Sequence, residues 1–186
     1  MNVSETSLPG VLLIEPKVFG DDRGYFFESF RLDRYNASGV PYSFVQDNVS
    51  RSRRGVLRGL HLQEPKGQGK LVSVSLGEVF DVAVDVRVGS PSFGLWTGAY
   101  LSEKRKNQLW IPPGFAHGFV VTSDEAIFTY KCTEYYRPES ELTVRWNDPA
   151  IGIEWPVSEP SLSAKDLAAP MLADLSAVLP RFPGRS

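Results

Sequence analysis

The sequence predicts an all-β protein folded as a barrel or a double-sheet jelly roll. Short apolar runs recur along the chain, and glycine, proline or other turn-forming residues separate them. Strict alternation of apolar and polar residues is clearest from Val72 to Val88, where Gly77-Glu78 forms a turn between two runs. Strand after strand with short turns is typical of a closed or sandwiched β-structure.

Composition limits the classes of protein. The 186 residues suit one domain, spanning 1–186, and 42% hydrophobic content supplies a core. A formal net charge of -2 provides no general field for nucleic acid. The single cysteine, Cys132, excludes an intrachain disulfide and a cysteine-based zinc site. No run approaches the roughly 20 apolar residues that span a bilayer, and no basic leader precedes an apolar run, so we expect no membrane contact and a cytoplasmic location.

The N-terminal third is expected to hold three strands and one helix. Proline and glycine set most of the boundaries. In order, we expect a strand around Val11–Ile14 that stops at Pro16, a turn over Phe19–Gly24, a strand over Tyr25–Phe30, a helix over Arg31–Ser38 stopped by Gly39 and Pro41, and a strand over Tyr42–Val49.

The strands expected in the middle of the chain have the clearest sequence patterns. After a strand over Gly55–Gln63, the run Phe80–Val88 has one apolar face, while Asp81, Asp85 and Arg87 mark the other. That second face must turn either to water or to a polar cavity, and the pattern leaves both open.

The remaining strands lead to an irregular C-terminal region. We expect strands at Leu95–Leu101, Leu109–Ile111, Phe115–Val121 and Ala126–Lys131. After Tyr136 the chain becomes irregular, Ser163 and Asp166 match the capping box of a helix N-terminus, and Pro170 to Leu179 is expected to form a closing helix.

One short stretch combines a proton-transfer residue with an anion-binding one. His61, one of only two histidines, follows Arg58 on an expected strand. Histidine exchanges protons near neutral pH, and arginine can bind a phosphate bidentately. In a regular strand these two side chains point to opposite faces, unless Gly59 introduces a bulge. A packed core histidine is the plain alternative.

Several kinds of chemistry lack support. The chain has no Gly-x-Ser-x-Gly elbow, P-loop or Gly-x-Gly-x-x-Gly fingerprint. A facial iron triad from His61, His117 and either Asp81 or Glu78 is conceivable, but the positive charge of Arg58 would oppose a cation beside His61. We therefore expect no metal.

Acid–base catalysis is the kind of chemistry that the residues still support. His61 as base, Tyr130 as acid and Lys70 as a cation for an enolate oxygen would suit proton abstraction next to a carbonyl. Each has a simpler explanation: Tyr130 as a core aromatic, Lys70 as an exposed loop residue, Asp166 as a helix cap. The run Arg51–Arg54 is equally well explained as a solvated basic turn.

Taken together, the motifs resemble the dTDP-4-dehydrorhamnose 3,5-epimerase family. Their order and spacing carry the resemblance over nearly the whole chain. The matching segments are Glu15–Phe19, Asp22–Glu28, Gln46–Ser50, Val56–His61, Gly69–Val72, Phe80–Arg87, Trp110–Phe119, Trp146–Pro149 and Ser163–Asp166.

The resemblance implies a cupin-like jelly-roll barrel with short peripheral helices, a homodimer and no cofactor. It also implies that the substrate is a dTDP-4-keto-6-deoxyhexose. By resemblance, His61 is the base, Asp166 orients it, Tyr130 is the acid and Lys70 lies by the C4 oxygen. Resemblance further implies substrate contacts from Arg23, Glu28, Gln46, Asn48, Arg58, His117, Glu141 and Lys165, and thymine stacking by Phe19 and Tyr136.

The expected activity is inversion of C3 and C5 of dTDP-4-dehydro-6-deoxy-D-glucose on the route to dTDP-L-rhamnose. A related enzyme acting at C3 or C5 only, a non-catalytic nucleotide-sugar-binding cupin and a metal-dependent cupin oxygenase are the alternatives. Leu142 stands where many family members have glycine, and the tail after Pro180 has no counterpart. For the homodimer, the segment Val11–Ile14 is expected to cover a sheet edge of the partner.

Overall fold

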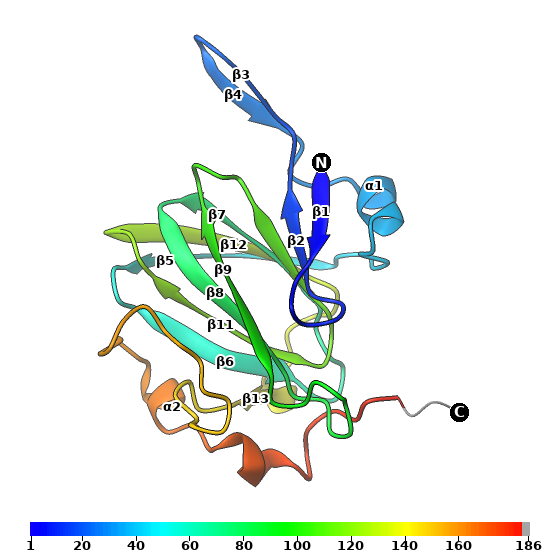
Figure 1. Cartoon of the computed structure of the whole chain (residues 1–186), viewed down its shortest axis with the longest axis vertical. Coiled ribbons are helices and arrows are strands. Elements are labelled where there is room, and N and C mark those ends of the chain that lie inside the picture. Colours follow the sequence, from blue (N-terminus) through cyan, green and yellow to red (C-terminus); the bar gives the residue numbers. More distant parts are fainter. Residues whose placement is uncertain (184–186) are drawn as a thin grey trace.

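Two antiparallel β-sheets face each other in the computed structural model, which describes residues 1–183 (Figure 1). The larger sheet has six strands, in the spatial order β1 (Asn2–Glu5), β2 (Leu12–Glu15), β10 (Gln108–Ile111), β7 (Lys70–Leu76), β12 (Glu125–Cys132) and β5 (Gln46–Arg53). The smaller sheet has five, in the order β13 (Glu141–Thr143), β6 (Leu57–Gln63), β11 (Phe115–Val121), β8 (Glu78–Asp85) and β9 (Trp96–Ser102). The all-β prediction is confirmed. In the described residues the two sheets do not close into one barrel, so the double-sheet alternative is the correct one.

The smaller sheet is buried on both faces. Between the sheets, Val79 and Ala83 of β8 pack with Phe119 and with Phe128 of the larger sheet. On the opposite face, the C-terminal segment covers the sheet through apolar side chains that include Val144, Ile151, Leu172 and Leu179. The polar face of β8 therefore turns inward: Asp81 and Asp85 are both fully buried. The sequence left open whether this face turns to water or to a polar cavity, and the structure excludes exposure to water.

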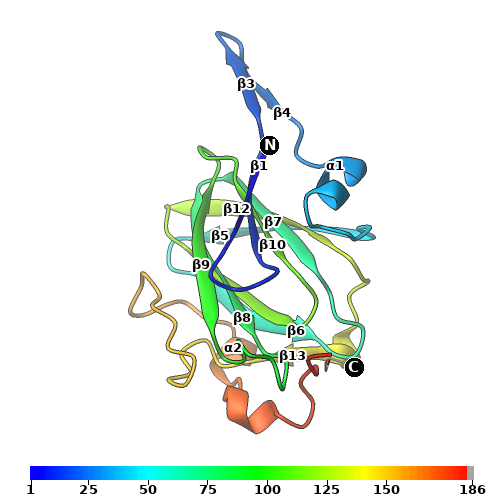
Figure 2. The ribbon, with the colours of Figure 1, turned by 45° about the vertical axis from the view of Figure 1, so that its right-hand side comes forward.

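The expected turn over Phe19–Gly24 is wrong in its extent, because this segment belongs to a separate hairpin in which only Asp22 and Arg23 form the turn. Strands β3 (Val18–Asp21) and β4 (Gly24–Phe27) pair only with each other and project beyond both sheets, as Figures 1 and 2 show. Phe19, Tyr25 and Phe26 are exposed on the hairpin, with 70% of Phe26 accessible to solvent. A two-stranded hairpin alone is at best marginally stable in water, so this one exposes apolar surface that a partner could cover.

Val11–Ile14 does not cover a partner's edge, contrary to the expectation. Strand β2 lies inside the larger sheet, where β1 pairs with one of its edges and β10 with the other. Both sides of its backbone are thus hydrogen-bonded within the same chain.

The basic run lies in a strand. The helix α1 (Leu32–Ala37) matches its prediction, but β5 begins at Gln46 rather than Tyr42 and continues through Arg53. Its full length pairs with β12, and Arg51 forms an ion pair with Glu125 across the two strands. The reading of Arg51–Arg54 as a turn is therefore wrong for all but its last residue.

A bulge in β6 turns Arg58 and His61 to the same cavity. On the pairing strand β11, His117 lies opposite His61 and Phe119 opposite Arg58, so two steps on β11 match three on β6. Gly59 supplies the extra residue with a φ of +136°, which is accessible to glycine but not to other residues without strain. The bulge at Gly59, without which Arg58 and His61 would point to opposite faces, is therefore present.

Replacing Gly59 by alanine is expected to destabilise the fold and displace both side chains. A Cβ there would lie 2.6 Å from the Cα of Gly118, and backbone atoms cannot retreat as a flexible side chain can. Gly55→Ala is the matched control, because Gly55 also has positive φ but nothing within 4 Å of its added Cβ. We expect Gly55→Ala to cost about 1–2 kcal/mol in urea unfolding and Gly59→Ala clearly more. Equal losses would contradict the steric argument.

The C-terminal region is less helical than expected. Ser163 caps α2 (Ala164–Leu167) by accepting a hydrogen bond from the Asp166 amide, at 3.1 Å. The predicted closing helix over Pro170–Leu179 is wrong, because only Leu172–Leu175 (η2) forms a short 3-10 turn. Anchoring of Leu172 and Leu179 on the smaller sheet fixes this segment instead. The 3-10 turn η1 (Pro138–Ser140) and strand β13 were not predicted.

Candidate active site

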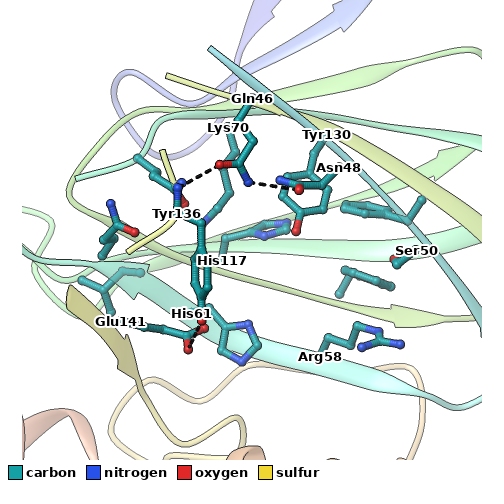
Figure 3. Close-up of a pocket in the computed structure, with 15 residues that line it drawn as sticks. Gln46, Asn48, Ser50, Arg58, His61, Lys70, His117, Tyr130, Tyr136 and Glu141 are labelled. Carbon is teal, nitrogen blue, oxygen red and sulfur yellow. Dashed lines mark hydrogen bonds between the residues drawn. The ribbon is translucent and has the colours of Figure 1, made fainter. Parts of the chain in front are cut away.

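A cavity of about 340 Å³ lies between the sheets and gathers most of the residues singled out from the sequence (Figure 3). Strands β5, β6, β7, β11 and β12 supply its walls, and the segment after β12 supplies its rim. The predicted residues that line it are Gln46, Asn48, Arg58, His61, Lys70, His117, Tyr130, Tyr136 and Glu141. Residues from distant parts of the chain thus meet because the two sheets face each other.

His61 and Asp166 form a hydrogen-bonded pair at one wall. The His61 Nε2 lies 2.6 Å from Asp166 Oδ1, which leaves Nδ1 as the ring nitrogen available to a substrate. Ser163 Oγ donates to the other carboxylate oxygen of Asp166 at 2.9 Å. Burial favours the protonated form of Asp166, but the hydrogen bonds from His61 and Ser163 outweigh it and lower the pKa of this carboxyl. A buried carboxylate held in this way fixes the orientation of the His61 ring.

Lys70 and Tyr130 approach the same space from the larger sheet. In the pairing of β7 with β12, Lys70 lies opposite Cys132, two residues from Tyr130, so both side chains are on the inner face. Lys70 is buried, contrary to its reading as an exposed loop residue. Burial lowers the pKa of Lys70 and raises that of Tyr130. Tyr130 is therefore a neutral phenol that can donate a proton or a hydrogen bond.

His117 belongs to a second buried histidine–carboxylate pair. Its Nε2 lies 2.9 Å from Asp81 Oδ2, and its ring stacks on Phe128 with centroids 5.9 Å apart. Sequence reasoning considered Asp81 only as a ligand of a disfavoured iron triad and did not expect it to bind His117. The only signal was its place on the polar face of an alternating strand.

The rim of the cavity is held by polar contacts. Gln46 accepts a hydrogen bond from the Tyr136 amide at 2.8 Å, and Tyr136 donates from its hydroxyl to Glu141 at 3.1 Å (Figure 3). Glu141 also forms an ion pair with Lys165 at 2.8 Å. Burial favours the protonated form of Glu141, but the contact with Lys165 outweighs it and lowers the pKa of this carboxyl. Lys165 itself lines an adjoining hollow of about 310 Å³, together with Arg58 and the His61–Asp166 pair.

Three residues expected to bind substrate lie away from the cavity of their own chain. Phe19 and Arg23 lie on the β3–β4 hairpin, where Arg23 pairs with Asp21 at its tip. Glu28 follows the hairpin and forms an ion pair with Arg34 of α1. Within one chain, the structure does not bring these side chains to His61.

Two further observations concern residues 1–183. None of their histidine, cysteine, aspartate and glutamate side chains gather in a group of three that could hold a metal ion. None of their helices has the length and apolar character needed to cross a membrane.

Comparison with known proteins gives consistent matches. The family model described as dTDP-4-dehydrorhamnose 3,5-epimerase matches residues 5–174. The Salmonella typhimurium enzyme of that name is 58% identical, over 92% of this chain and 96% of the relative. A dTDP-6-deoxy-D-glucose-3,5-epimerase from Legionella pneumophila, solved with dTDP-4-keto-L-rhamnose, superimposes with a TM-score of 0.96 and 54% identity, covering 98% and 99% of the two chains. A 3'-monoepimerase from Streptomyces bikiniensis, solved with dTDP-quinovose, has a TM-score of 0.89 and 36% identity, covering 95% and 91%.

Fold, cavity and relatives together define the class of protein, which is a cupin-like isomerase. The family model spans most of the chain, and the identity to the Salmonella enzyme extends over nearly its full length. The chain belongs to the dTDP-4-dehydrorhamnose 3,5-epimerase family.

Proposed function

We propose that this enzyme inverts C3 and C5 of dTDP-4-dehydro-6-deoxy-D-glucose and forms dTDP-4-dehydro-L-rhamnose, within dTDP-L-rhamnose biosynthesis. One observation carries the proposal: His61 on one sheet, held by Asp166 of α2, and Lys70 and Tyr130 on the facing sheet line a single cavity. A base and an acid on opposite sides of a ring are what inversion of a carbon centre requires.

In the first step His61 removes a proton from a carbon next to the C4 ketone. Both C3 and C5 are such carbons, so one base can serve both centres in turn. Asp166 keeps Nε2 of His61 occupied, directs Nδ1 to the sugar and stabilises the imidazolium that forms.

The resulting enolate carries negative charge on the C4 oxygen. Lys70 is buried in the cavity wall, and a cation in such a site stabilises developing charge far more than it would in water. We place the C4 oxygen at Lys70.

Tyr130 returns a proton from the other face of the sugar. Proton removal by His61 on one face and delivery by Tyr130 on the other inverts the centre. The raised pKa of Tyr130 keeps the phenol protonated at neutral pH, as an acid requires.

Binding of the nucleotide and the sugar is assigned to the remaining polar residues. Arg58 is suited to the diphosphate because guanidinium binds phosphate oxygens bidentately. Gln46, Asn48, His117, Glu141 and Lys165 add polar contacts around the cavity, and Tyr136 provides an aromatic surface for thymine. A cytoplasmic location remains part of the proposal.

A homodimer would explain the position of Phe19, Arg23 and Glu28. The projecting hairpin of one protomer could reach the cavity of its partner and deliver Phe19 and Arg23 to the nucleotide there. The exposed aromatic side chains of the hairpin would then be covered.

We expect a dimeric mass in light scattering at micromolar concentration, and Phe26→Ser should shift it toward the monomer. Phe26 is 70% exposed on the hairpin, so its loss should weaken association without removing core contacts. Val178→Ser is the control, because Val178 is also exposed but lies on the C-terminal segment. A fully active wild-type monomer would refute this arrangement.

Turnover is expected to survive chelation and extensive dialysis. Asp166 and Asp81 occupy one nitrogen of each histidine, and Arg58 places a positive charge in the same cavity as both rings. Residual metal is measured alongside kcat. Loss of activity that stoichiometric metal restores would overturn the proposed chemistry.

Inversion at one centre only is the second candidate, favoured by the similarity to a 3'-monoepimerase. Incubation with dTDP-4-keto-6-deoxyglucose in D2O, followed by NMR at C3 and C5, separates the candidates. We expect deuterium and inversion at both carbons. Exchange at one carbon would support the single-centre enzyme, and binding without exchange would support a non-catalytic protein.

A further inference from the structure

The second histidine–carboxylate pair lies directly beside the first. His117 on β11 is opposite His61 on β6, and Asp81 lies on β8, the next strand of the same sheet. Both imidazole rings line the same cavity, as Figure 3 shows. The cavity wall thus carries two adjacent imidazoles, each bound to a buried carboxylate.

The ring of His117 is tightly constrained. Phe128 stacks on it at an interplanar angle of 20°, and only 7% of the residue is exposed. Because Asp81 binds Nε2, Nδ1 is the only ring nitrogen left for a substrate. A ring held in this way presents one polar atom in one direction.

A contribution to folding stability does not by itself explain why a carboxylate is buried at Asp81. It is fully buried, and its Oδ1 has no hydrogen-bond donor among residues 1–183. Burial raises the pKa of Asp81, and the hydrogen bond from His117 and the nearby charge of Lys70 only partly offset this effect. A buried carboxylate with one oxygen unpaired commonly costs more than an apolar residue of similar size, so a role through His117 accounts better for it.

We propose that Asp81 is a positioning residue that acts through His117 on the enolate. Asp81 accepts a hydrogen bond from Nε2–H of His117 and compensates the positive charge of the ring. The Nδ1–H of His117 then donates a hydrogen bond to the C4 oxygen, beside Lys70. No proton is transferred to or from His117, because the substrate proton goes to His61. This inference rests on the proposed function.

The proposal predicts the same defect at both carbons. Asp81→Asn keeps the shape and an acceptor for Nε2–H but removes the charge that stabilises the imidazolium. We expect kcat to fall by about 10²-fold with KM nearly unchanged, because the lost interaction strengthens only as the enolate forms. Deuterium incorporation at C3 and C5 should fall in step, since both centres share one C4 oxygen.

Asp85→Asn is the matched control. Asp85 is a buried carboxylate on the same face of β8, but it binds Arg87, Ser90 and Ser92 and does not line the cavity. We expect it to lower the unfolding midpoint and to leave kcat unchanged in the protein that remains folded. A merely structural Asp81 would behave in the same way.

A double-mutant cycle tests whether Asp81 acts through His117. The variant with both Asp81→Asn and His117→Asn should be no slower than His117→Asn alone. Additive losses, an unchanged kcat in Asp81→Asn, or loss of exchange at one carbon only would each overturn the proposal.

A measurement on the wild-type protein covers the case in which Asp81→Asn does not fold. The chain has two histidines, so ring ¹⁵N signals can be assigned with His61→Asn. We expect His117 to be protonated at both ring nitrogens, and an unprotonated Nε2 or Nδ1 would overturn the proposal. This result does not depend on turnover, whereas failure of the wild-type enzyme to epimerise would refute the proposed function instead.

Discussion

Replacing His61 by asparagine is expected to stop deuterium incorporation at both C3 and C5. Without the base no enolate forms, whichever centre reacts first, and the rate should fall by about 10²–10⁴-fold or more. The Asp166 carboxylate cannot substitute for the missing base, because it lies behind the ring and is only 2% exposed. The measurement is NMR of the substrate in D2O, with dTDP binding followed by calorimetry.

Binding separates a catalytic defect from a folding defect in this experiment. The asparagine variant should bind dTDP almost as the wild type does, because Arg58 and the residues of the rim are unchanged. Asp166→Asn is the graded comparison: it keeps the imidazole but weakens its orientation and its charge compensation, so exchange should slow at both carbons without vanishing. Exchange that persists at one carbon in His61→Asn would show that a second base serves that centre.

The local pattern was sufficient to predict most strands and the turn at Gly77. Alternation reports which face of a strand is apolar, and the apolar faces of β7 and β8 are buried as that pattern requires. The parity of Arg58 and His61 showed that the two side chains could share a face only through a bulge, which Gly59 provides. Both features depend on neighbours within a few residues, and this is why the sequence contains them.

Features that depend on distant parts of the chain were harder to predict. Alternation in β8 could not decide between water and a cavity, because the larger sheet that faces Asp81 and Asp85 includes strands from distant parts of the chain, such as β12 with Phe128. The pairing of His61 with Asp166 joins residues 105 positions apart, so only family resemblance indicated it. The expected helix over Pro170–Leu179 failed for the same reason: contacts with the smaller sheet, rather than local propensity, determine that segment.

Replacing Tyr130 by phenylalanine is expected to separate exchange from inversion. His61 can still remove the proton, so an enolate forms, but no acid stands on the other face. The histidine then returns a proton to the face it left, and in D2O this yields starting material that carries deuterium. We expect inverted product to fall by about 10²–10⁴-fold while wash-in of deuterium continues.

The matched control for this variant is Tyr100→Phe. Tyr100 lies on β9, is 40% exposed and does not line the cavity, so removal of its hydroxyl should leave both exchange and inversion as in the wild type. The phenyl ring in Tyr130→Phe retains the apolar contacts, including the packing against Phe128 at 5.9 Å, so folding and dTDP binding should hardly change. Comparison with His61→Asn is decisive. If Tyr130→Phe loses deuterium wash-in as completely as the base variant does, the phenol is needed before the enolate forms, and the division of roles between the two faces is wrong.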